Sequence, residues 1–231
     1  MKSRKSGKEE KRSGWTWQKT GAVAVGLFFV VVMVVSSLGT GWLTGLVTVK
    51  PGDSVVINYT LRDNQGRPVV TTDQKLYTDT IQNRQIVLYT GPRLMAANMT
   101  ATGSFSPIDV YFRGDTMKFG LFSEETNRIS QGVVGMKTGE QKRINIGLPV
   151  ESLYYIPMDR FEEYFGNETE IAPGVQVPLF LSDQESVPLM NDTPSNIYVR
   201  IASIVNQSPE GVTLDYGYSA ADVTMVRINN E

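Results

Sequence analysis

The sequence predicts an α+β fold, in which a curved antiparallel sheet packs on a short helix behind one N-terminal transmembrane helix and carries a small inserted β-rich domain. Three observations predict it. A stretch with no charge runs from Lys19 to Lys50, most later apolar segments alternate like strands, and helical signals are confined to Glu124–Val134 and a segment opening at Pro157. With 231 residues, 41% of them hydrophobic and 20% charged, the chain can form one or two folded units.

The uncharged stretch predicts a transmembrane signal anchor over residues 20–46, because a bilayer core needs about 20 apolar residues as helix. Residues 1–19 hold seven Lys or Arg against two Glu, whereas the rest holds fifteen against twenty-two Asp or Glu. Positive charge stays in the cytoplasm, so we expect a single-pass cell-membrane protein with a basic cytoplasmic tail and an extracytoplasmic body. A cleaved signal peptide is the alternative, since small residues near Ser36 and Gly39 fit a processing site.

A hairpin is predicted at the start of the body. Apolar and polar residues alternate from Ser54 to Leu61, "DNQG" supplies turn chemistry, and a second short strand covers Val69–Thr71. The segment from 73 to 107 gives no clear pattern. Further strands are predicted at Ile108–Phe112, Met117–Phe122, Lys142–Leu148, Val175–Leu181, Ile197–Val205 and Asp222–Ile228.

The composition excludes several kinds of chemistry. The chain has no cysteine and no histidine, which excludes disulfides, catalytic triads and the usual zinc sites. The glycines of "GVVGMKTGE", residues 132–140, do not match a phosphate-binding loop. The basic tail borders an apolar span and is read as a topology signal, so nucleic acid is not an expected partner. No cofactor is expected.

Three stretches carry a resemblance. In order, "VKPGDSVVINYTLRDNQGRPVV", "ISQGVVGMKTGEQKRINIGLPVESLYY" and "GVTLDYGYSAADVTMVRI" resemble the FKBP-type peptidyl-prolyl cis-trans isomerases. The segments "YIPMDRFEEYF", "EIAPGVQVPLFL" and "NIYVRIASIVNQSPEGVTLDY" look like the insert-in-flap domain of the SlyD-like two-domain branch. The resemblance implies an FKBP-like isomerase domain at 47–153 plus 214–231, with 73–116 as an extra insertion, and an insert-in-flap-like chaperone domain at 154–213.

The resemblance also implies a function. It is that of a rotamase and folding chaperone whose partners are proline-containing unfolded or partly folded polypeptides, held to the membrane by the anchor. Rotating an X-Pro bond requires no nucleophile and no proton transfer, which suits a chain without His or Cys. By position, the implied catalytic residues are Tyr59 and Tyr154, and the implied substrate-binding residues are Val69, Val70, Ile129, Val133 and Met225.

One departure from the family pattern concerns the pocket. Val69 and Val70 stand where the family usually has Phe-Asp, so an aromatic ring and a carboxylate are lost. The histidine-rich tail of some SlyD-like proteins is absent too, and no metal is implied. The alternative is therefore a catalytically weak or inactive FKBP-like binding module for unfolded or envelope proteins. A structural envelope component is a third alternative.

Overall fold

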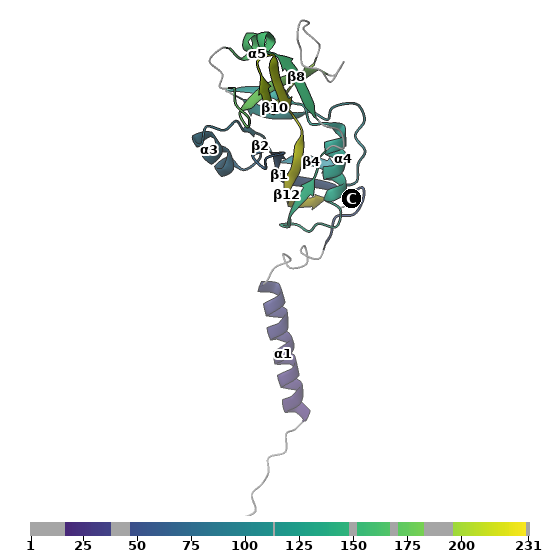
Figure 1. Cartoon of the computed structure of the whole chain (residues 1–231). Coiled ribbons are helices and arrows are strands. Elements are labelled where there is room, and N and C mark those ends of the chain that lie inside the picture. Colours follow the sequence, from purple (N-terminus) through teal and green to yellow (C-terminus); the bar gives the residue numbers. More distant parts are fainter. Residues whose placement is uncertain are drawn as a thin grey trace, which may run out of the picture. The chain divides into compact units, whose positions relative to one another are not determined.

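The chain forms two compact units, Met1–Leu46 and Val47–Glu231, and each is described by itself. The structure is a computed structural model that describes residues 17–37, 47–112, 114–147, 152–166, 171–182 and 196–229. Figure 1 shows the helices and strands of both units. The predicted basic tail, residues 1–19, lies almost entirely outside the described residues.

The first unit contains helix α1, Trp17–Ser37. Among the residues that the structure describes, no helix is long and apolar enough to cross a membrane. The helix has 21 residues, but it begins with Trp-Gln-Lys-Thr and ends with two serines, so its continuous apolar part is shorter than the about 20 residues of a bilayer span. The predicted transmembrane anchor over residues 20–46 is therefore wrong. The prediction that depends on this anchor is wrong as well, namely a single-pass location in the cell membrane with a cytoplasmic N-terminus and an extracytoplasmic body.

The second unit is a mixed α+β structure with a curled, half-barrel sheet (Figure 1). The strand order is β7-β12-β1-β2-β3-β5-β6-β10-β11-β8, while β4 pairs with β1 and β9 pairs with β10. Helices α3, Gln74–Gln82, α4, Ser123–Gly132, and α5, Met158–Phe165, complete it. The strands are β1 Ser54–Asp63, β2 Pro68–Thr71, β3 Leu88–Tyr89, β4 Arg93–Ala96, β5 Ile108–Phe112, β6 Asp115–Phe119, β7 Gln141–Asn145, β8 Leu153–Pro157, β9 Gln176–Ser182, β10 Ile197–Ser208, β11 Gly211–Asp215 and β12 Tyr218–Asn229.

The predicted hairpin is confirmed as β1 and β2. Along β1, Val55, Ile57 and Tyr59 are buried on one face, as a period of two requires. In the turn, the Asp63 carboxylate accepts hydrogen bonds from the backbone N–H groups of Gln65 and Arg67. Strand β12 returns along the other side of β1 over the whole length of β1. The chain therefore closes its first and last strands against each other.

Two groups of buried apolar residues form the core of the second unit. The first cluster gathers around α4 and includes residues of β1, β2, β4, β5, β6, β7 and β12. The second cluster gathers around α5, β8, β9 and β11. Strand β10 takes part in both, because Val199 and Ile201 belong to the first cluster while Ala202 and Ile204 belong to the second.

The predicted fold class is corrected in a second respect. The described strands between 154 and 213 do not form a sheet of their own but belong to the same 12-stranded sheet as β1. Strand β10 meets β6 in parallel at Val199 and Phe119. Next to this pair, the fully buried Arg200 guanidinium forms two 2.9 Å contacts with the Glu125 carboxylate of α4. This buried ion pair joins β10 to α4, and no sequence pattern reveals it because the two residues are 75 positions apart.

Three further elements, α3, β3 and β4, lie in the segment that gave no clear sequence pattern. The Asp73 carboxylate caps α3 by accepting from the N–H groups of Lys75 and Leu76. The rings of Tyr77 and Tyr89 pack with centroids 5.5 Å apart and tie α3 to β3. Strand β4 pairs with the first four residues of β1. This segment is therefore folded onto the sheet rather than extending away from it.

Candidate functional site

The structure brings six of the seven predicted site residues together. They all belong to the first cluster and are at most 3% exposed: Tyr59, Val69, Val70, Ile129, Val133 and Met225. The seventh, Tyr154, lies on β8 and packs against the second cluster. The two predicted catalytic hydroxyl groups therefore stand in different parts of the core.

The elements explain the grouping. Tyr59 lies on the inner face of β1, two residues after Ile57, and Met225 is the β12 partner of Ile57. Ile129 lies on the buried side of α4, and Val133 is the residue at its C-terminal end. A sheet that curls around a helix places these side chains in one apolar layer.

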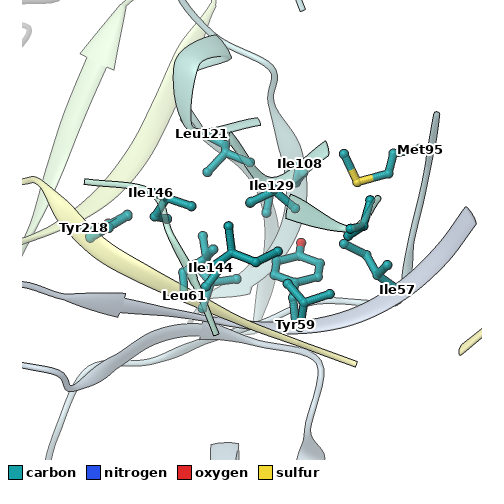
Figure 2. Close-up of a cluster of buried hydrophobic side chains, with 14 of the residues drawn as sticks. Ile57, Tyr59, Leu61, Met95, Ile108, Leu121, Ile129, Ile144, Ile146 and Tyr218 are labelled. Carbon is teal, nitrogen blue, oxygen red and sulfur yellow. The ribbon is translucent and has the colours of Figure 1, made fainter. Parts of the chain in front are cut away.

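This layer is closed by residues from the segment 73–116. Met95 of β4 and Ile108 of β5 share the first cluster with Tyr59, and Figure 2 shows the Tyr59 hydroxyl directed to the side of Ile129. Burial raises the pKa of Tyr59 to about 12, against the opposing effects of the Arg93 charge and a hydrogen bond with Thr90. The Tyr59 hydroxyl is therefore neutral at pH 7 and shielded from solvent.

Arg93 stands at the rim of the same layer, although it is not among the predicted site residues. It begins β4 opposite Ile57, and its Nη2 donates a 2.8 Å hydrogen bond to Ser106 Oγ. Burial lowers the pKa of Arg93, and the neighbouring Tyr59 raises it. The sequence alone does not show that Arg93 lies near Tyr59, because this proximity depends on the pairing of β4 with β1.

The second cluster has a more open surface. Among the described strands, β8 ends the strand order and pairs only with β11. Leu153 and Tyr155 of β8 are 44% and 51% exposed. The Tyr155 ring lies across Gly211, where an added Cβ would come within 2.6 Å of the ring. Burial raises the pKa of Tyr154, and the neighbouring Tyr164 raises it further. This edge combines apolar side chains with backbone groups free for pairing.

A charged cleft lies on the outer side of the sheet, lined by residues of β7 and β12 including Lys142 and Thr224. The Asp222 carboxylate there binds both Arg62 and Arg143, each at 2.5 Å. The hydrogen bond from Arg143 and the Arg62 contact lower the pKa of Asp222 to about 2, although partial burial opposes them. The cleft is thus held by satisfied ion pairs.

Among the described residues, no group of three or more Asp or Glu side chains is placed to hold a metal ion. No protein-family model matches the sequence, and no curated protein is found to be similar to it. In the described part of the chain, the first cluster and the edge of β8 offer buried hydroxyl groups, apolar side chains and the partly shielded Arg93 guanidinium. Such groups suit non-covalent binding.

Proposed function

We propose that the chain is an FKBP-type folding helper that holds unfolded polypeptide, and that its peptidyl-prolyl cis-trans isomerase activity is weak. The motifs "VKPGDSVVINYTLRD" and "GVVGMKTGEQKRINI" support the family assignment. So does the arrangement in which β1, β2, β7 and β12 curl around α4. The isomerase and the binding module are the two forms of this proposal, and they differ in whether the first cluster admits a proline ring.

One observation supports polypeptide binding, rather than catalysis, as the main activity. Six of the seven residues predicted for the proline pocket are at most 3% exposed, whereas β8 presents Leu153 and Tyr155 to solvent at a sheet edge. A proline ring must enter a pocket before its peptide bond can be twisted. An extended chain needs only a free strand edge and apolar side chains beside it. Access therefore favours polypeptide binding over catalysis.

The edge of β8 is better suited to an added strand than the edge of β9. Residues 153–156 carry no charge and no proline, so each can offer its backbone groups to an incoming chain. In β9, Pro178 lacks the N–H that strand pairing uses. Polypeptide segments rich in apolar residues would therefore pair with β8 and cover Leu153 and Tyr155.

The test is an aggregation-suppression assay with the full chain and a chemically denatured client. The wild type should reduce light scattering in proportion to its concentration. Tyr155→Asp should weaken client binding by about tenfold or more, because it places a charge in an apolar contact. Tyr111→Asp is the matched control, since Tyr111 of β5 is 55% exposed and lies away from the β8 edge.

A wild-type chain that leaves aggregation unchanged would overturn the proposed function. Equal losses with Tyr155→Asp and Tyr111→Asp would remove the β8 edge as the binding surface.

A further inference from the structure

Arg93 differs from the other arginines in the described part of the chain. Six of these arginines have a carboxylate partner: Arg62, Arg67, Arg128, Arg143, Arg160 and Arg200. Arg84 and Arg227 have none and are exposed to water. Arg93 is only partly exposed, and no carboxylate among the described residues is paired with it.

The shielding follows from the strand geometry. Arg93 and Met95 are two residues apart on β4, and so point to the same face of the sheet. Met95 is buried in the first cluster, and the β1 partner of Arg93 is the buried Ile57. The guanidinium is therefore held at the edge of an apolar layer, where it keeps only part of the hydration that it would have in water.

Partial loss of hydration costs a charged group free energy, and a guanidinium cannot avoid this cost by losing its proton because it stays charged in proteins. Shielded charges in proteins are normally paired, as the Arg200 guanidinium is paired with Glu125 at 2.9 Å. The hydrogen bond to Ser106 Oγ uses one of the five N–H donors of Arg93 and brings no negative charge. Arg93 therefore retains donors and a positive charge without a counter-ion from the described residues.

The surroundings leave a way in for a ligand. Arg93 and Ser106 are both partly exposed, whereas Tyr59 beneath them is buried. The Thr90 hydroxyl already donates to the Asp109 carbonyl at 2.7 Å, so Arg93 and Ser106 supply the free polar groups at this rim.

We propose that Arg93, with Ser106 beside it, is a binding site for a carboxylate. A carboxylate has the planar, two-oxygen geometry that a guanidinium binds with two parallel hydrogen bonds. The carboxylate belongs either to a small free acid or to the C-terminus of a polypeptide. The site does not depend on client binding at β8, and its test separates the two.

The test is an NMR titration of the full chain, read at the Arg93 Nε–H signal. One arm uses acetate and a second uses a short peptide with a free C-terminus. A third uses the same peptide with an amidated C-terminus, and chloride at equal ionic strength corrects for salt. We expect a saturable shift with acetate or the free peptide and none with the amidated peptide. A shift with the free peptide well below the acetate concentration would assign the site to polypeptides, and a shift with acetate alone would assign it to small acids.

Arg93→Gln keeps a hydrogen-bonding side chain and removes the charge. It should weaken carboxylate binding by about ten- to a hundredfold, the usual effect of losing a charge-assisted hydrogen bond. In this variant binding is followed at the Ser106 amide. Arg143→Gln is the matched control, because Arg143 is already paired with Asp222 on the outer side of the sheet. Titrations in which Arg93 shifts no more with acetate or free peptide than with chloride would overturn the proposal, as would equal binding by Arg93→Gln and the wild type.

Discussion

The two clusters of the second unit differ in how they meet solvent. The first cluster is wrapped by strands on several sides and by α4, and its predicted pocket residues are almost entirely buried. The second cluster is covered by α5 on one side and ends at β8, an edge strand with two exposed apolar side chains. The difference teaches that residues carrying a family resemblance can become core, while the exposed apolar side chains of β8 lie elsewhere on the same sheet.

The junction between the clusters should be the most sensitive place in the fold. Glu125→Gln leaves the Arg200 charge buried without a partner, and we expect a loss of about 3–5 kcal/mol in the free energy of unfolding. Glu124→Gln is the matched control, because Glu124 is exposed and its contact with Arg128 is a surface pair. Denaturant unfolding followed by circular dichroism measures both. Equal, small losses in the two variants would show that the buried pair does not hold the junction.

The same truncation in each cluster tests whether the clusters unfold together. Ile129→Ala in the first cluster and Ile156→Ala in the second should each lower the free energy of unfolding by about 2–5 kcal/mol, the range for a buried isoleucine. Because β10 runs through both clusters, each variant should still unfold in a single transition. Two separated transitions in either variant would mean that the clusters are independent units.

A smaller effect is expected where α4 packs against β7. A Cβ added at Gly132 would lie 2.6–2.8 Å from three carbons of Ile144, so Gly132→Ala should cost about 1–3 kcal/mol through overpacking. Gly91→Ala is the control, because nothing lies within 4 Å of a Cβ at that position. Thermal unfolding of the two variants should separate them clearly. Similar melting temperatures would contradict the close approach of α4 and β7.

The smallest expected effect concerns the outer side of the sheet. The pKa of Asp222 is lowered from 3.8 to about 2, so its ion pairs stabilise the fold above about pH 4, and this contribution is lost as the pH falls towards 2. Since the pairs are partly exposed, Asp222→Asn should cost less than about 1 kcal/mol at pH 7. Unfolding curves of the two proteins should converge at low pH. A constant difference down to pH 2 would exclude this titration as its cause.

Local patterns predicted the strands that alternate regularly. The hairpin of β1 and β2, the long strands β10 and β12, and the helices after residues 122 and 157 all follow from period and turn chemistry. The two-residue strand β3 and the five-residue strand β8 are set by their partners rather than by their own residues. No local pattern marks the Arg200–Glu125 pair, because the two residues are 75 positions apart.

The candidate site was predictable in part. Position in the motifs predicted Tyr59, Ile129 and Met225 in one pocket, and the structure has them in one apolar layer because strands and a helix of regular period place them there. It did not reveal that Met95 and Ile108 would close that layer, since the pairing of β4 with β1 is a tertiary feature. It also gave no sign of Arg93, which is partly shielded from solvent and has no carboxylate partner among the described residues.

The most direct test of the account is to measure both proposed activities on one preparation of the full chain. In a proline-limited refolding assay, we expect at most a small acceleration, unchanged by Tyr59→Phe, because the Tyr59 hydroxyl is buried. In the aggregation assay, the same preparation should protect a denatured client and lose that protection with Tyr155→Asp. Strong acceleration of refolding that is reduced by Tyr59→Phe, together with client protection unaffected by Tyr155→Asp, would contradict the account.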